Sequence, residues 1–178
     1  MADLTVARRY AQAIFSLAKD QNRFDEWDAE LTTIAEALQQ PELRAALESV
    51  RAPFAAKREL IQSVFAETVS PLAKNFLLLL VQRGRLQLLD DIIAFYRRLV
   101  DEERGIARAR VTTAVPLDES ERERVAQRLA AITGKQIRLE TAVDPTILGG
   151  LIARIGDKLI DGSTRTRLLA LRQRLAAG

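Results

Sequence analysis

DEERGIARARVTTAV, residues 101–115, is the stretch in which the hydrophobic pattern of this chain changes. Before Gly105, apolar residues recur at intervals of three and four, which is typical of amphipathic helices. After Gly105, apolar and polar residues alternate, which predicts a strand with one buried face formed by Ala107, Ala109, Val111 and Val115. We therefore predict an α+β multidomain chain, divided into residues 1–105 and 106–178.

The first predicted domain is a six-helix bundle. Its fifth helix has the clearest ends, because Ser70 suits the N-cap, Pro71 the first helical position and Gly84 a C-terminal stop. The run Phe76–Val81 in this helix is apolar all round, which indicates either a central helix or one that shows a face to a partner. The other helices are predicted near residues 4–19, 23–38, 41–48, 53–65 and 86–100.

The second predicted domain is a small mixed α/β domain in the order strand, helix, three strands, helix. Asp118 and Glu121 have the spacing of a capping box at the start of the first helix, and Gly134 ends that helix. Gly156-Asp157 favours a tight turn between the last two strands, near residues 148–155 and 158–160. Ser163 is the predicted cap of the final helix.

The composition argues against an active site. The 178 residues include neither His nor Cys, which removes thiolate nucleophiles, imidazole bases and the commonest zinc ligands. Gly134-Lys135 resembles the end of a phosphate-binding P-loop, but Leu129 stands where that loop needs glycine. We predict no catalytic residue, cofactor, metal or small-molecule ligand.

Two features of the sequence bear on location. The longest apolar run has six residues, Phe76–Val81, whereas a membrane-spanning helix needs roughly 20. The first residues also lack the basic and apolar regions of a secretory signal. We expect neither a membrane span nor a signal peptide.

The charge of the chain leaves two kinds of partner open. Residues 1–105 carry 14 basic and 16 acidic side chains, a net charge of −2, whereas residues 106–178 carry 13 and 8, a net charge of +5. A basic second domain suits an acidic protein or a nucleic acid. It contains no Phe, Tyr or Trp on which bases could stack, which disfavours nucleic acid. A basic RNA-binding module fused to a helical bundle remains the alternative.

Three sets of motifs, in order along the chain, carry a resemblance to a known family. They are VARRYAQAIF at residues 6–15, NFL with GRL at 75–77 and 84–86, and a C-terminal set of Asp144, LGGL at 148–151, Gly156-Asp157 and IDGS at 160–163. In order and spacing the chain resembles the delta-subunit family of F-type ATP synthases, whose mitochondrial counterpart is the oligomycin-sensitivity-conferring protein.

This resemblance implies a non-catalytic stator component. In that family the N-terminal bundle binds N-terminal helices of alpha subunits, and the C-terminal domain meets the b subunits of the peripheral stalk. The catalytic head is thereby held still while proton transport drives ATP synthesis. The resemblance also implies a peripheral position on the cytoplasmic face of a bacterial plasma membrane, with membrane association only through the complex.

The resemblance places the alpha-binding groove between the first and fifth helices. Carried onto this sequence, the groove residues are Ala7, Tyr10, Ala11 and Ile14 from the first helix, with Asn75 and Leu79 from the fifth. The small alanines would let a partner helix approach closely. The same spacing also suits interior core residues, and the pattern alone does not separate these two fates.

Overall fold

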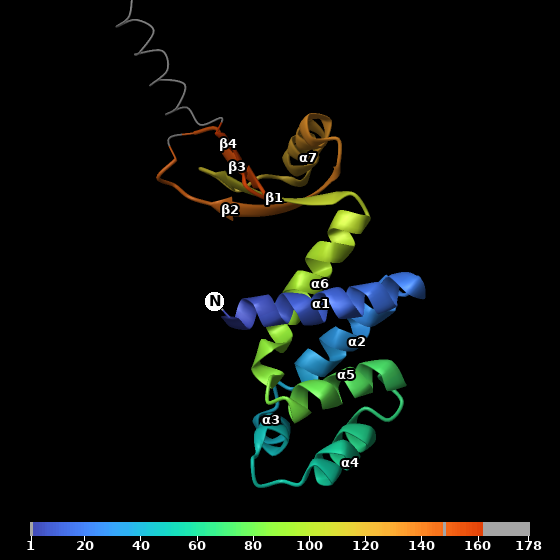
Figure 1. Ribbon diagram of the computed structural model, residues 1–178. Coiled ribbons are helices and arrows are strands. Elements are labelled where there is room, and N and C mark those ends of the chain that lie inside the picture. Colours follow the sequence, from blue (N-terminus) through green and yellow to red (C-terminus); the bar gives the residue numbers. More distant parts are fainter. Residues whose placement is uncertain (1, 148, 162–178) are drawn as a thin grey trace, which may run out of the picture. The chain divides into compact units, whose positions relative to one another are not determined.

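The computed structural model describes residues 2–147 and 149–161 (Figure 1). It has seven α-helices and a four-stranded mixed sheet in these residues, which makes it an α+β fold. The chain divides into two compact units, Met1–Val100 and Asp101–Gly178. The predicted helix after Ser163 lies outside the described residues.

The first unit is helical and is followed by the strands of the second. Its helices are α1 (Ala2–Asp20), α2 (Phe24–Ala37), α3 (Pro41–Glu48), α4 (Phe54–Val64), α5 (Pro71–Gln82), the 3-10 helix η1 (Leu86–Leu88) and α6 (Leu89–Glu103). The periodic apolar residues of these helices share one core, in which Leu31, Leu77 and Tyr96 are fully buried. The hydroxyl of Tyr96 donates to the carbonyl oxygen of Phe24 at 2.8 Å, so its polar end is satisfied inside that core.

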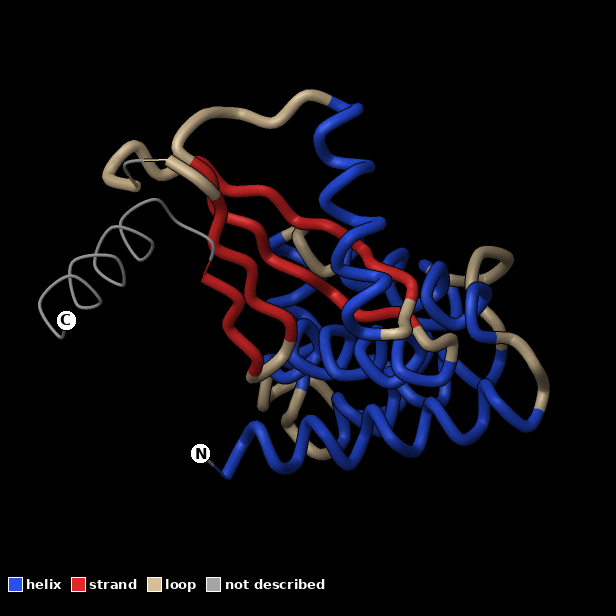
Figure 2. Tube along the Cα trace, turned by 90° about the horizontal axis from the view of Figure 1, so that it is seen from above, coloured by secondary structure: helices blue, strands red, loops and turns tan. Residues whose placement is uncertain are grey.

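The second unit holds the sheet. Its elements are β1 (Ile106–Thr113), α7 (Glu119–Thr133), β2 (Gln136–Val143), β3 (Leu151–Ile155) and β4 (Lys158–Asp161). The strand order is β2-β1-β3-β4, with β1 parallel to β2 and antiparallel to β3. Helix α7 lies along one face, as Figure 2 shows, and its Leu129 belongs to the same buried cluster as Ala109, Val111 and Ala153.

Local chemistry fixes the ends of α7 as the sequence predicts. The backbone N–H of Glu121 donates to Asp118 at 2.8 Å, and the Glu121 carboxylate accepts from the Asp118 N–H at 3.0 Å, which confirms the capping box. Gly134 ends the helix in the left-handed region, with φ of 68°, where a side chain would be strained.

Several boundaries differ from the sequence prediction, including the following three. Strand β1 ends at Thr113, whose hydroxyl donates to the carbonyl oxygen of Val115 at 2.7 Å. Strand β3 begins at Leu151 because Gly149 and Gly150, with φ of 129° and 83°, interrupt the extended backbone. The second unit begins at Asp101 in the last turn of α6, whereas we predict a boundary after Gly105.

Asp101 explains where the second unit starts. Its side chain is 8% exposed and accepts from the guanidinium groups of Arg108 on β1 and Arg138 on β2, the latter at 3.2 Å. A buried carboxylate requires such partners, because its desolvation costs several kcal/mol if it is unpaired. Asp101, although it lies in α6, therefore belongs to the second unit.

Candidate partner-helix interface

The N-terminus of helix α5 is held by its own N-cap, Ser70, and by Glu30 of α2. The Ser70 hydroxyl accepts from the Ala73 N–H at 3.3 Å, which confirms the predicted N-cap. The Glu30 carboxylate on α2 accepts from both the Ser70 hydroxyl, at 2.7 Å, and the Ser70 N–H, at 3.2 Å. A carboxylate at this end also interacts favourably with the helix dipole, so α5 has a fixed start.

Helix α5 has one buried and one exposed apolar face. Ala73, Leu77, Leu80 and Val81 are buried in the core. Leu72 and Leu79 remain 39% and 38% exposed, and Asn75 is exposed between them. Positions 72, 75 and 79 lie on one stripe of a helix, so α5 shows two leucines with one asparagine between them to solvent.

The groove residues predicted on helix α1, apart from Tyr10, are buried. Ala7 and Ala11 are fully buried and Ile14 is 2% exposed, all within the core of the helical unit. Tyr10 is half-buried at the margin of this core, and Leu17, two helical turns further along the same flank, is exposed. The structure thus gives Ala7, Ala11 and Ile14 a core position in the free chain.

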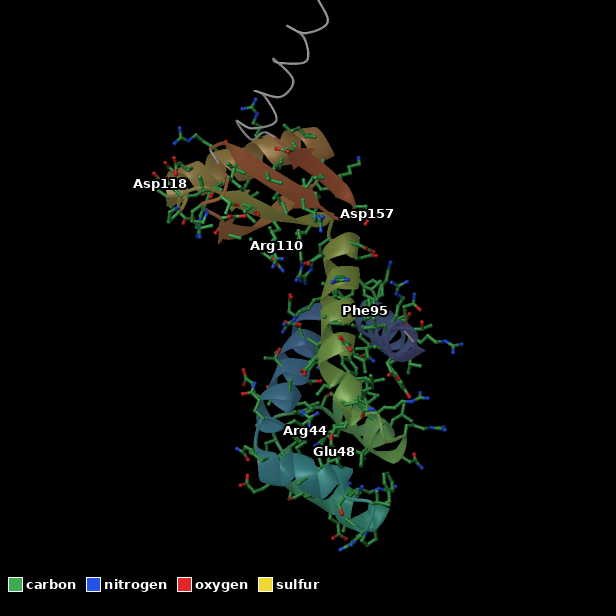
Figure 3. The ribbon with its side chains drawn as sticks, turned by 90° about the vertical axis from the view of Figure 1, so that its left-hand side faces the viewer. Arg44, Glu48, Phe95, Arg110, Asp118 and Asp157 are labelled. Carbon is green, nitrogen blue, oxygen red and sulfur yellow. The ribbon has the colours of Figure 1, made fainter. Side chains whose placement is uncertain are left out.

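The opposite flank of α1 is occupied by other helices. Phe15 stacks on Phe24 of α2 with ring centroids 5.5 Å apart. The Arg8 guanidinium lies 5.3 Å from the ring centroid of Phe95, the α6 residue labelled in Figure 3. The flank with Tyr10 is the one that contacts α5, through Phe76.

Tyr10 joins α1 to α5. Its ring meets Phe76 edge to face, with centroids 6.2 Å apart. Its hydroxyl accepts a hydrogen bond from the Arg85 guanidinium at 3.2 Å, and the same guanidinium lies 5.9 Å from the ring centroid. Tyr10, Phe76 and Arg85 form what we term the aromatic junction.

The aromatic junction separates the predicted site residues into two groups. Tyr10, Asn75 and Leu79 border or extend an accessible surface, whereas Ala7, Ala11 and Ile14 lie beneath it. This region also includes four residues outside the predicted groove set: Phe76, Arg85, Leu17 and Leu72. Leu72 could have been found by its spacing of seven from Leu79, which places both on one helical stripe.

Two carboxylates of the second unit, Asp118 and Asp144, have hydrogen-bond partners close by in the chain. Hydrogen bonds from the Glu121 N–H and the Ser120 hydroxyl hold the pKa of Asp118 below its ordinary value. Donation by the hydroxyl and N–H of Thr146 lowers the pKa of Asp144 in the same way. Both groups therefore stabilise a turn or helix cap in their charged form.

Two further features limit the kinds of site within the described ranges. Within residues 2–147 and 149–161, no three His, Cys, Asp or Glu side chains gather to hold a metal ion. The helices in these ranges are also too short or too polar for a membrane span. Exposed leucines on one helix, bordered by fixed aromatic contacts, are typical of proteins that bind other proteins.

Comparison with known proteins identifies the family. The family model described as "ATP synthase delta (OSCP) subunit" matches residues 6–175. The chain is 38% identical over 173 residues to "ATP synthase subunit delta" of Dehalococcoides mccartyi (strain ATCC BAA-2266 / KCTC 15142 / 195), covering 97% of this chain and 95% of that protein. It is 34% identical over 180 residues to the protein of that name from Syntrophobacter fumaroxidans, covering 100% and 98%.

Structural comparison agrees on the fold. A chain in the cryo-EM structure of the Toxoplasma gondii mitochondrial ATP synthase hexamer is 24% identical, with a TM-score of 0.62, covering 97% of this chain and 98% of that chain. This protein belongs to the ATP synthase delta (OSCP) subunit family and is a stator component of F-type ATP synthase. Because the match spans both predicted domains, an unrelated RNA-binding module fused to a bundle is not supported.

Proposed function

We propose that residues 1–105 act as a six-helix bundle that binds N-terminal helices of alpha subunits, and that residues 106–178 meet the b subunits. The chain then links the catalytic head to the peripheral stalk, so that torque driven by proton transport is used for ATP synthesis. Membership in the delta family supports this role. We place the chain on the cytoplasmic face of the plasma membrane, attached peripherally through the complex.

One observation carries the alpha-subunit part of the proposal. Leu72 and Leu79 are large apolar side chains that stay exposed on α5 although the helix has a well-filled core face. A partner helix would bury them together with Leu17 of α1, in the manner of an amphipathic helix in an apolar groove. Tyr10 and Phe76, already in contact, would form part of the surface under that helix.

The role requires no active site in the chain itself. The sequence lacks His and Cys, and Asp118 and Asp144 are engaged by the backbone of their own turns. A stator element resists torque through extended contacts with its partners. We therefore assign this chain a structural role, with no cofactor or small-molecule ligand.

A titration tests the alpha-subunit contact. A synthetic peptide of the cognate alpha-subunit N-terminus is added to the full chain labelled with ¹⁵N, and amide shifts are followed by NMR. We expect saturable shifts concentrated in residues 10–17 and 72–79. A peptide that does not bind, or that shifts only amides of residues 106–161, would contradict the proposal.

A further inference from the structure

The face of the sheet opposite α7 is rich in arginine. Side chains alternate along β1, so that Ala109 and Val111 face α7 and Arg108 and Arg110 lie on the other side. The strand registers place Arg138 of β2 and Arg154 of β3 beside them on this same side. Figure 3 shows Arg110 on the side of the sheet away from α7.

These four arginines differ in their acidic partners. Arg108 and Arg138 both bind the buried Asp101 carboxylate. Arg110 and Arg154 are exposed, and within residues 2–147 and 149–161 neither has an acidic side chain in ion-pairing distance. Glu140 on β2 is the register partner of Arg110, yet the two form no ion pair in the described part of the chain.

Arg110 and Arg154 are also direct cross-strand partners. The antiparallel register of β1 and β3 pairs them, so two positive charges stand opposite one another. Like charges in this position destabilise a sheet. A fold that keeps this pair exposed has a preformed site for an anion, because two neighbouring guanidinium groups can each bind a carboxylate through two hydrogen bonds.

The surroundings of the pair favour an acidic protein segment. Ile152 is half-buried and Leu159 is exposed on the same side of the sheet, which also carries the exposed acidic residues Glu140 and Asp161. The surface therefore offers apolar as well as ionic contacts. Nucleic acid would need stacking platforms, and residues 106–178 contain no aromatic residue. Residues 163–178 of this chain have four arginines and no acidic residue, so their charge disfavours them as the occupant.

We infer that Arg110 and Arg154 form a docking point for an acidic segment of a protein partner. This inference rests on the proposed function, in which the partner of the second unit is the b subunit of the peripheral stalk. It assigns the stalk contact to the sheet face opposite α7. The contact is ionic at its centre, with Leu159 and Ile152 beside it, and it weakens as salt rises.

The test measures binding of two probes to the full chain. The probes are the soluble part of the cognate b subunit and poly-L-glutamate, each at low and at high salt. The variant is Arg110→Gln with Arg154→Gln. The control is Arg128→Gln with Lys135→Gln, which removes the same charge from exposed residues of α7 and its following turn. We expect the variant to bind both probes roughly 10-fold more weakly at low salt, and the control to match wild type.

The outcomes separate this inference from the proposed function. If wild type and variant bind the b subunit equally, the docking site is wrong while the stator role stands. If wild type binds poly-L-glutamate through the pair but does not bind the b subunit, the proposed function fails and the acidic site stands. Oligouridine is measured in the same way as a third probe. Loss of oligouridine binding in the variant, with b-subunit and poly-L-glutamate binding unaffected, would overturn the inference in favour of RNA. Thermal unfolding checks folding, and relief of the like-charge pair predicts an equal or higher Tm for the variant.

Discussion

The substitution Leu72→Ala together with Leu79→Ala tests the exposed stripe of α5. Complete burial of a leucine side chain is worth about 1.5–3 kcal/mol. With 39% and 38% of these residues still exposed, a partner helix can gain roughly 0.6–1.1 kcal/mol from each by covering the remainder. The double variant should therefore lose about 1–2 kcal/mol of binding free energy, which is about 5-fold to 30-fold in Kd.

Isothermal titration calorimetry with the alpha-subunit peptide measures this loss. The control is Val64→Ala on α4, because Val64 is 42% exposed and lies outside the α1 and α5 stripes. We expect wild-type affinity for the control, and thermal unfolding shows that each variant is folded at the titration temperature. An unchanged Kd in the double variant would refute the placement of the partner helix on α5.

Three further predictions concern folding. Asp101→Asn should destabilise the chain by about 2 kcal/mol in urea unfolding, because it removes the charge that two arginines bind. The control is Glu102→Gln, which changes the neighbouring exposed carboxylate and should have little effect. Ala11→Leu should cost about 2 kcal/mol by overpacking a fully buried position, and near-wild-type stability with lost alpha binding would instead show that this residue contacts the partner. Asp118→Ala should lower the Tm at neutral pH by removing the cap of α7. The pKa of Asp118 is lower in the folded state than its ordinary value of 3.8. The stability contributed by the cap is therefore present above pH 3.8 and is lost as the pH falls through the folded pKa. The difference in Tm between variant and wild type should accordingly close in acid.

The features that could be predicted from sequence are those decided within a few residues. Ser70 and Pro71 start α5 and Asp118 with Glu121 starts α7, because each cap satisfies backbone groups one turn away. The change to a period of two after Gly105 likewise predicts β1 without knowledge of its neighbours. Such local signals predict the α-helices and strands of the described residues, whereas the 3-10 helix η1 is not predicted as a separate element.

The features that could not be predicted depend on residues far apart in the chain. Arg85 donates to Tyr10 across 75 positions, and Arg138 binds Asp101 across 37. No local pattern marks either pair. The alanine stripe of α1 shows the same limit, because a helix core and a helix-binding groove both require small apolar residues at this spacing, and only packing places Ala7 and Ala11 inside.

In the proposed role, this chain joins the catalytic head to the peripheral stalk and catalyses no step itself. Mass photometry measures this linkage directly. The cognate head is assembled without its delta subunit and mixed with the soluble b subunits. We predict that a particle with the summed mass of head, chain and b subunits forms only when this chain is added. A head that binds the b subunits equally well without the chain, or a chain that forms only one of the two binary complexes, would contradict the account.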